Sequence, residues 1–183
     1  MAKQFDHITD EQRAFVEAQQ IYFTGSAAQD GRVNVSPKGQ DSLRILGPNR
    51  LIWLNLTGSG NETAGHLLDC NRMTLMWCSF DKKPLIYRVY GSAKTVHKGD
   101  ADWDALYGHF PPNIGARQIF DVDVEMTQTS CGYAVPLMEF GAVRDTLDRA
   151  MEAKGDDPAP RYWAENNMIT IDGKPTGMPE QAV

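Results

Sequence analysis

Residues 31–39, Gly31-Arg32-Val33-Asn34-Val35-Ser36-Pro37-Lys38-Gly39, have the pattern of a β-strand that runs into a tight turn. Because side chains alternate along a strand, every second residue from Arg32 to Lys38 is expected on one face. That face carries two cations, and Asn34 and Ser36 add neutral hydrogen-bonding groups to it. Such a surface suits a polar ring and a phosphate, whereas an exposed polar strand face is the alternative interpretation.

A glycine-rich turn occurs in the stretch Trp53-Leu54-Asn55-Leu56-Thr57-Gly58-Ser59-Gly60-Asn61-Glu62-Thr63, between an apolar strand and a helix. The glycines permit a close backbone approach, and the free N–H groups at a helix entrance favour an anion. The stretch is neither a Walker loop nor a dinucleotide fingerprint, because no Gly-Lys-Ser/Thr follows and the strands are not βαβ units. The turn therefore predicts a phosphate site, with an ordinary helix cap as the alternative.

Hydrophobic periodicity predicts a chain built mainly of closely spaced strands. Thr9 and Gln12 form a capping-box pattern, which predicts a short first helix. The expected strands are residues 21–27, 33–36, 43–46, 51–56, 73–80, 85–97 and 117–126. Further helices are expected at 102–110, at 139–154, and from Asn61 or Thr63 to near Asn71. Short connections favour an antiparallel meander or Greek-key barrel with helices at its periphery.

The composition is typical of one globular domain. The 183 residues are 42% apolar and 23% charged, so residues 1–183 are expected to form a single domain, with a C-terminal helix and tail over about 139–183. A net charge of −6 argues against nucleic acid or an anionic membrane as partner. The apolar stretches are shorter than the roughly 20 residues of a membrane span. The first residues lack a secretory signal, so a cytoplasmic protein is expected. The spacing of cysteines and histidines predicts no metal site.

The two polar segments occur in an order that resembles the pyridoxamine 5'-phosphate oxidase-like family. A strand ending in Asn34-Val35-Ser36-Pro37-Lys38-Gly39 is followed by a hairpin and by Gly60-Asn61-Glu62-Thr63 at the entrance of a helix. The resemblance covers about Phe15 to Val96 and includes Arg88-Val89-Tyr90-Gly91-Ser92-Ala93. More loosely, Ser130-Cys131-Gly132-Tyr133 and Ile171-Asp172-Gly173-Lys174-Pro175-Thr176-Gly177 resemble a bacterial FMN-binding subgroup. The resemblance implies a six-stranded antiparallel split β-barrel.

The resemblance also implies a homodimer with FMN in each of two clefts at the subunit interface. By position, Asn34, Val35, Ser36 and Lys38 would contact the isoalloxazine ring or the ribityl chain of FMN, with Asn55 beside them. Asn61, Glu62 and Thr63 would lie at the phosphate end, and Trp163 or Tyr133 would reach the cofactor from the second subunit.

Two departures separate the chain from the authentic vitamin oxidase. That enzyme carries an arginine and a lysine five positions apart on the first strand, whereas Arg32 and Lys38 are six positions apart. It also has a Ser-Arg-Lys run at the helix entrance, where this chain has Glu62-Thr63. The hypothesis is therefore an FMN-dependent oxidoreductase with an unassigned small-molecule substrate, in which the flavin performs the chemistry and no side chain is assigned as catalytic. The alternatives are a non-enzymatic protein that stores or senses flavin or haem, a deazaflavin in place of FMN, and a purely structural dimer.

Overall fold

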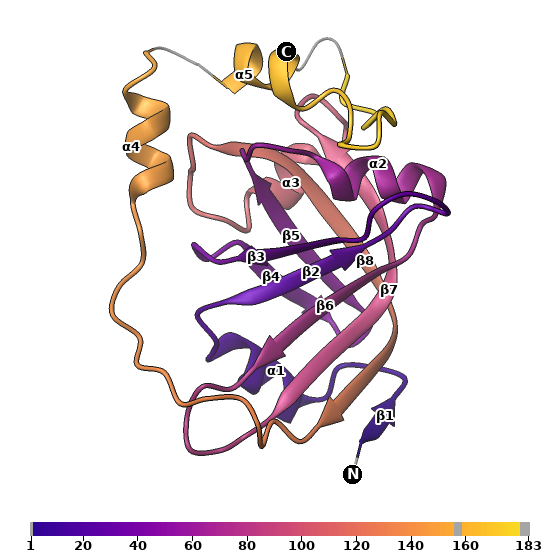
Figure 1. The fold of residues 1–183 in the computed structure, drawn as a ribbon, viewed down its shortest axis with the longest axis vertical. Helices are drawn as coiled ribbons and strands as arrows, with labels where there is room; N and C mark the ends of the chain where they lie inside the picture. Colours follow the sequence, from indigo (N-terminus) through magenta and orange to yellow (C-terminus); the bar gives the residue numbers. More distant parts are fainter. Residues whose placement is uncertain (1, 156–158, 180–183) are drawn as a thin grey trace.

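The computed structural model describes residues 2–155 and 159–179, and its centre is one antiparallel sheet that curls into a barrel (Figure 1). In chain order the elements are β1 (Lys3–Phe5), α1 (Asp10–Glu17), β2 (Tyr22–Ser26), β3 (Asn34–Lys38), β4 (Leu43–Gly47), β5 (Arg50–Leu56), α2 (Glu62–Asp69), β6 (Met73–Cys78), β7 (Ile86–His97), α3 (Trp103–Tyr107), β8 (Ala116–Ser130), α4 (Thr146–Glu152) and α5 (Ala159–Asn166). The strands lie in the order β3-β2-β6-β7-β8-β5-β4, and β1 pairs with β8. The predicted fold class, mainly β with peripheral helices, is confirmed.

The described part of the chain has eight strands, whereas periodicity predicted seven and the family resemblance implied a six-stranded barrel. The strand missing from the sequence prediction is β1, whose three residues pair with residues 127–129 of β8. Three residues are too few to establish a period of two, so only pairing with a distant partner defines this strand. β8 itself runs to Ser130, past its predicted end at residue 126, because its last residues pair with both β1 and the start of β7.

Aromatic side chains fill the barrel. Trp53 stacks on Phe120 with the ring centroids 4.7 Å apart, and Trp77 stacks on Tyr22 at 5.7 Å. None of these four residues is more than 5% exposed. α1 lies at the lower end of the barrel in Figure 1 and adds Val16 to the same core. These contacts bring the inward faces of β2, β5, β6 and β8 together, and the walls of the site are built on that frame.

A second apolar cluster covers the outer side of β5 and β8. Ile52 and Leu54 of β5 pack there with Ile119 of β8 and with Trp103 and Leu106 from α3. β5 is therefore buried on both faces, which explains why its sequence is a continuous apolar run rather than an alternating one.

The capping box of α1 is confirmed. The backbone N–H of Gln12 donates to Thr9 Oγ1 at 3.3 Å, and the backbone N–H of Thr9 donates to Gln12 Oε1 at 2.9 Å. This motif is local, so sequence spacing alone was enough to find it.

The helix predicted over residues 139–154 is wrong in its first half. α4 covers only Thr146–Glu152, and residues 139–145 have no regular secondary structure. Val143, one of the residues that suggested an apolar helical stripe, is 61% exposed, as is Phe140 at 59%, and the described residues offer neither a surface to pack against. Without such packing a short helix is marginal in water.

The tail after α4 contains a helix that the sequence analysis did not predict. α5 (Ala159–Asn166) buries Ala159 and Trp163 against Met151 of α4 and Met178. The residues that pack against α5 come from separate parts of the tail. A hydrophobic period within residues 159–166 therefore did not indicate the helix. Tertiary contact defines this helix.

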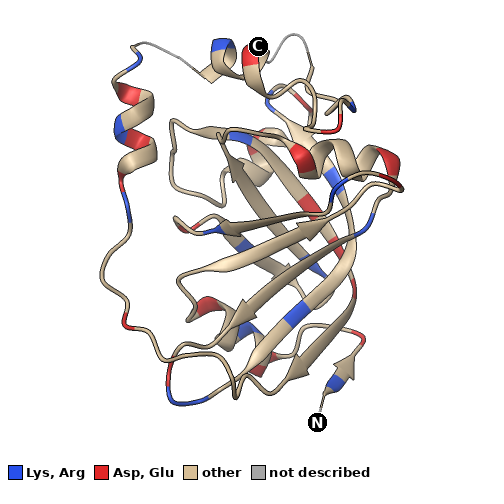
Figure 2. Cartoon of the chain, in the orientation of Figure 1, with Lys and Arg blue, Asp and Glu red and all other residues tan. Residues whose placement is uncertain are grey.

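Acidic and basic residues are interspersed along the chain, without a continuous basic face (Figure 2). No helix in residues 2–155 and 159–179 is both long and apolar enough to cross a membrane.

Gly91 marks a change of register between β7 and β8. Tyr90 is opposite Met126 while Gly91 is opposite Val124, so Glu125 is an extra residue on β8. A Cβ atom at Gly91 would lie 2.0 Å from the backbone carbonyl oxygen of Asp123. The two backbones approach closely at this bulge because residue 91 has no side chain.

Gly91→Ala is expected to destabilise the fold by about 1–3 kcal/mol, because the β7 and β8 backbones must separate to admit the methyl group. The free energy of unfolding from urea denaturation measures this loss. Gly47→Ala is the matched control, because a Cβ atom there meets nothing within 4 Å. Equal stability of the two variants would mean that the bulge does not depend on a glycine.

Candidate functional site

A cavity of about 700 Å³ lies among the end of β3, the end of β5 and the entrance of α2, with the start of β8 and the loop after α5 beside it. Most of the residues predicted to bind the cofactor line this cavity, although they come from three separate elements. They are Asn34, Ser36, Lys38, Asn55, Asn61, Glu62 and Thr63. The fold thus brings the two polar segments of the sequence to one place.

Hydrogen bonds join β3 to α2 along one wall of the cavity. Ser36 Oγ donates to Asn34 Oδ1 at 3.2 Å, and Asn34 Nδ2 donates to Thr63 Oγ1 at 3.4 Å. Ser26 of β2 extends this series of hydrogen bonds. Its Oγ donates to Thr63 Oγ1 at 3.2 Å and lies 3.1 Å from His66 Nδ1. These neutral groups hold the two segments in register and present amide and hydroxyl groups to a ligand.

Asn61 stands at the N-cap position of α2, but its side chain does not cap the helix. Its amide instead exchanges two hydrogen bonds with Gln118 of β8: Gln118 Nε2 donates to Asn61 Oδ1 at 2.8 Å, and Asn61 Nδ2 donates to Gln118 Oε1 at 3.3 Å. The Asn61 side chain therefore leaves the first N–H groups of α2 free, and the helix dipole adds partial positive charge there. This end of the cavity favours an anion.

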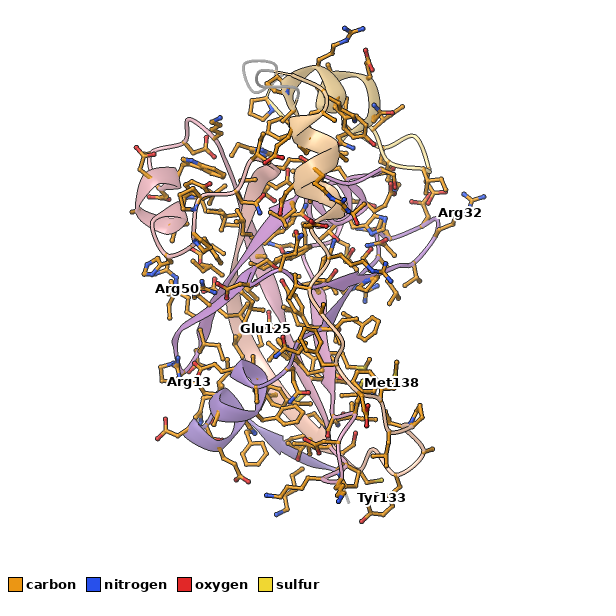
Figure 3. The ribbon with its side chains drawn as sticks, turned by 90° about the vertical axis from the view of Figure 1, so that its left-hand side faces the viewer. Arg13, Arg32, Arg50, Glu125, Tyr133 and Met138 are labelled. Carbon is orange, nitrogen blue, oxygen red and sulfur yellow. The ribbon has the colours of Figure 1, made fainter. Side chains whose placement is uncertain are left out.

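The Glu62 carboxylate is directed to the C-terminal loop. It accepts the backbone N–H of Ile171 at 3.1 and 3.2 Å, one distance to each oxygen. Asp172, the next residue, forms an ion pair with Arg32, which lies at the outer edge of the molecule (Figure 3). Both charges predicted near the ligand at this corner are thus used to hold the loop, and Glu62 contributes its backbone N–H rather than its carboxylate to the anion end.

Lys38 is a partly buried cation. Its Nζ lies 4.9 Å from the centroid of the Trp53 ring, and the residue is not paired with a carboxylate in the described part of the chain. Burial, with the nearby charge of Arg117 as a second cause, lowers the pKa of Lys38 to about 8. An anionic ligand beside Lys38 would raise this pKa and keep the ammonium group protonated at mildly alkaline pH as well.

Arg117 was not among the predicted site residues. It lines the cavity from the start of β8, is 3% exposed, and burial lowers its pKa to about 10. An arginine at the first position of an expected strand has no periodic signal that would distinguish it from a surface residue. Only the three-dimensional structure places it beside Lys38.

Two of the predicted residues do not line the cavity in this chain. Val35 projects from the other face of β3 and is 66% exposed. Trp163 is buried in the cluster formed by the tail, where its Nε1–H donates to Thr57 Oγ1 at 2.9 Å. Its position supports the glycine turn from behind, so a contact from Trp163 to a ligand in a partner's cavity would require that this packing open.

The curled antiparallel sheet defines a split-barrel protein, and a polar, cationic cavity lies at a helix entrance on that barrel. The family profile described as pyridoxamine 5'-phosphate oxidase matches residues 8–131, which is more than half of the chain. The chain therefore belongs to the pyridoxamine 5'-phosphate oxidase family. The family resemblance and the split-barrel fold are confirmed, and the bacterial FMN-binding subgroup stays a prediction.

Individual relatives agree with this assignment. The pyridoxamine 5'-phosphate oxidase family protein ustO of Aspergillus flavus is 32% identical over 163 residues, a region that covers 86% of this chain and 62% of the relative. The chain thus spans less than two thirds of that relative's length. A putative pyridoxamine 5'-phosphate oxidase from Lactobacillus delbrueckii has a similar structure, with a TM-score of 0.55, 20% identity, and coverage of 67% of this chain and 94% of that one. A single-residue variant of HupZ from Group A Streptococcus gives a TM-score of 0.54 at 18% identity, covering 67% of this chain and 99% of that one.

Lys38→Met is expected to stabilise the ligand-free protein below pH 8 by about 1–3 kcal/mol, because it removes a partly buried cation whose pKa is lowered in the folded state. Between pH 8 and about 10.5 the unfolded chain holds the proton and the folded chain does not, so the free energy of unfolding of the wild type rises with pH. The difference in the free energy of unfolding between Lys38→Met and the wild type should therefore shrink as the pH rises from 8 to about 10.5. Urea denaturation at several pH values measures it.

The matched control is Lys94→Met, since Lys94 is exposed and paired with Asp102, and its loss should change stability by less than about 0.5 kcal/mol. A Lys38→Met variant that is less stable than the wild type at pH 7 would mean that the lysine is balanced by a charge or stabilised by packing within the chain.

Proposed function

We propose that this chain is an FMN-binding flavoprotein that acts as an FMN-dependent oxidoreductase, with the cofactor in the cavity described above. The observation that carries the proposal is the combination of an uncapped helix entrance with two cations, the partly buried Lys38 and the buried Arg117, that have no carboxylate partner in the described residues. A cavity of this kind requires an anionic ligand to balance it. Membership of the pyridoxamine 5'-phosphate oxidase family supports FMN as that ligand.

The groups of the cavity fit FMN at both ends. A volume of about 700 Å³ lies within the range of roughly 300–1,000 Å³ typical of small-molecule sites. Asn55 Oδ1 is buried and has no hydrogen-bond partner in the described structure, so it is free to accept from a ring N–H. Asn34 and Ser36 offer further polar groups along β3, and the α2 entrance offers backbone N–H groups to a phosphate.

Bound FMN would supply the electron and hydride chemistry, and the residues of the chain would bind, orient and tune it. The Lys38 ammonium, placed over Trp53 and next to the polar β3 face, would stabilise negative charge that develops on a ring beside it. The hydrogen-bonded wall of Asn34, Ser36 and Thr63 would keep the ligand in one orientation.

A haem-binding function is the second candidate from the sequence, and the cavity favours flavin over it. Haem iron is commonly held by a histidine, cysteine, methionine or tyrosine ligand. His66 is the one residue of these types among the described residues that line the cavity. It is 2% exposed and its Nδ1 lies 3.1 Å from Ser26 Oγ, so it is held as part of the wall.

The proposal includes a homodimer, supported by exposed apolar side chains on β3 beside the site and on the segment between β8 and α4. Val33 and Val35 on and beside β3 are 71% and 66% exposed. The segment between β8 and α4 runs along the outside of the barrel in Figure 1, and its Tyr133 and Leu137 are 83% and 70% exposed. A second copy of the chain would cover these groups, and the exposed Tyr133 is better placed than the buried Trp163 to reach a partner.

The cofactor is tested by titrating the purified protein with FMN and with riboflavin. We expect FMN to bind at least about tenfold more tightly, because each charge-assisted hydrogen bond to the phosphate is worth roughly 1.5–3 kcal/mol. Quenching of flavin fluorescence measures both dissociation constants, and the visible absorption spectrum distinguishes flavin from haem. Equal affinity for the two flavins, or binding of haem alone, would contradict the proposal.

The assembly is tested with Val35→Asp, which places a charge on the apolar face of β3. We expect the wild type to sediment as a dimer and the variant to sediment as a monomer that binds FMN at least about tenfold more weakly, because burying an unpaired charge is costly. Analytical ultracentrifugation with flavin absorbance reports both properties. Ile114→Asp is the control, since Ile114 is 43% exposed in the loop before β8. A wild-type monomer with full FMN occupancy would rule out the dimer.

A further inference from the structure

A short hairpin of the C-terminal tail, residues 169–175, lies beside α2 at the edge of the cavity (Figure 1). The backbone N–H of Thr170 donates to the carbonyl oxygen of Lys174 at 2.8 Å. Gly173, whose φ is +77°, closes the turn, and its N–H donates to the carbonyl oxygen of Thr170 at 3.0 Å. These hydrogen bonds fix the shape of the hairpin, so the directions of its side chains are defined as well.

The charged side chains of the hairpin fasten it to the rest of the molecule. Asp172 accepts the backbone N–H of Arg32 at 2.7 Å and forms an ion pair with the Arg32 side chain. Lys174 pairs with Asp30 and also with Asp69, whose carboxylate lies 2.7 Å from Lys174 Nζ. The hairpin is therefore held both to the loop between β2 and β3 and to the end of α2.

Two glycines make room for this hairpin. A Cβ atom at Gly65, in the interior of α2, would overlap the methyl group of Thr170. Gly31 has a φ of +94°, and a Cβ atom there would lie 2.6 Å from Asp172 Oδ2. Glycine in the interior of a helix is less favourable than alanine, so the close approach of the hairpin explains Gly65.

The exposure of the hairpin side chains is the reverse of the usual arrangement, in which apolar groups are buried and polar groups face water. Thr170 is 4% exposed, and the Asp172 side chain is 12% exposed. Ile169 and Ile171 are 62% and 71% exposed, and both residues line the cavity. A hairpin that served only to cover α2 would place its isoleucines against the helix. This hairpin instead holds two apolar side chains beside the cavity.

The chemistry of the two isoleucines favours an apolar group of a ligand. They offer no hydrogen bond, so they do not suit a phosphate or a hydroxyl chain. An apolar group that binds beside them removes apolar surface of both molecules from water. Asn55, proposed to bind the flavin ring, is 3% exposed and thus lies deeper than the isoleucines. A substrate that enters and leaves in each catalytic cycle reaches the exposed edge of the cavity first.

We propose that Ile169 and Ile171 form an apolar subsite for the second substrate, which is therefore a small molecule with an aromatic or branched aliphatic group. The subsite rests on the proposed function, because it requires FMN in the deeper part of the cavity. The ion pairs of Asp172 and Lys174 keep the two isoleucines in place, so the apolar group meets a preformed surface.

The test is the binding of indole, a neutral aromatic probe, to the FMN-loaded protein, with the dissociation constant measured by saturation-transfer NMR. We expect the wild type to bind indole and the double variant Ile169→Ser, Ile171→Ser to bind it about tenfold or more weakly, because the apolar contact is lost. Both side chains are exposed, so the variant is expected to fold. Ile114→Ser is the matched control, since Ile114 is 43% exposed in the loop before β8 and is not among the described residues that line the cavity.

The same proteins are titrated with FMN and riboflavin and sedimented, to distinguish other occupants of this surface. The double variant should keep the oligomeric state of the wild type and change both flavin affinities less than about threefold. A loss of about tenfold or more in both affinities would assign the isoleucines to the flavin ring, and dissociation of the double variant alone would assign them to an interface between copies. Either result would overturn the subsite, as would equal indole binding by the wild type and the double variant, or no indole binding by the wild type.

A last comparison separates the subsite from the proposed function. If the wild type binds neither flavin, the proposed function fails, and indole binding to the protein without cofactor then decides the subsite. Binding that the double variant loses and Ile114→Ser keeps supports an apolar subsite in the cavity. Equal binding by all three proteins, or none by the wild type, rejects it.

Discussion

β8 pairs with three other strands, and the barrel, the fixed N-terminus and the site all depend on this pairing. It lies against β7 over most of its length, against β5 at its first half and against β1 at its end. The two β-bulges of β8 shape the barrel and the cavity as much as its regular pairing does. The bulge opposite Gly91 lets a long strand bend, and the bulge at Arg117 ends the regular pairing with β5 at the edge of the cavity.

The site combines a stiff neutral wall with a positive charge that the chain itself does not balance. Asn34, Ser36 and Thr63 satisfy one another through hydrogen bonds, so this wall does not need a ligand to keep its shape. Lys38 and Arg117 are different, because burial and their mutual repulsion disfavour both charges in the ligand-free protein. A ligand that binds the folded state and neutralises these charges would also stabilise the fold.

The C-terminal tail contributes to the walls and supports of the site, although no hydrophobic period in its sequence predicted this. Trp163 donates to Thr57 beneath the glycine turn, and Asn167 accepts from Arg117. The backbone N–H of Ile171 donates to the carboxylate of Glu62 and so fixes the direction of that side chain. A segment that follows the barrel in sequence therefore controls the electrostatics of a turn formed more than one hundred residues earlier.

The amino-acid sequence by itself determined the features that depend on neighbouring residues, because turn chemistry and strand alternation act over a few positions. The capping box at Thr9, the hairpin that ends in Lys38 and the glycine turn before α2 were predicted from local spacing, and they identified the family and most of the cavity-lining residues. Only the tertiary structure decided which charges meet in the cavity. Arg117 enters it because one extra residue on β8 shifts the pairing with β5, and Glu62 turns away because a distant backbone N–H is available. Val143 predicted a helical turn before α4 that does not form, since the described chain offers this side chain no packing surface. Each outcome depends on a contact between residues far apart in sequence, whose energy no local pattern records.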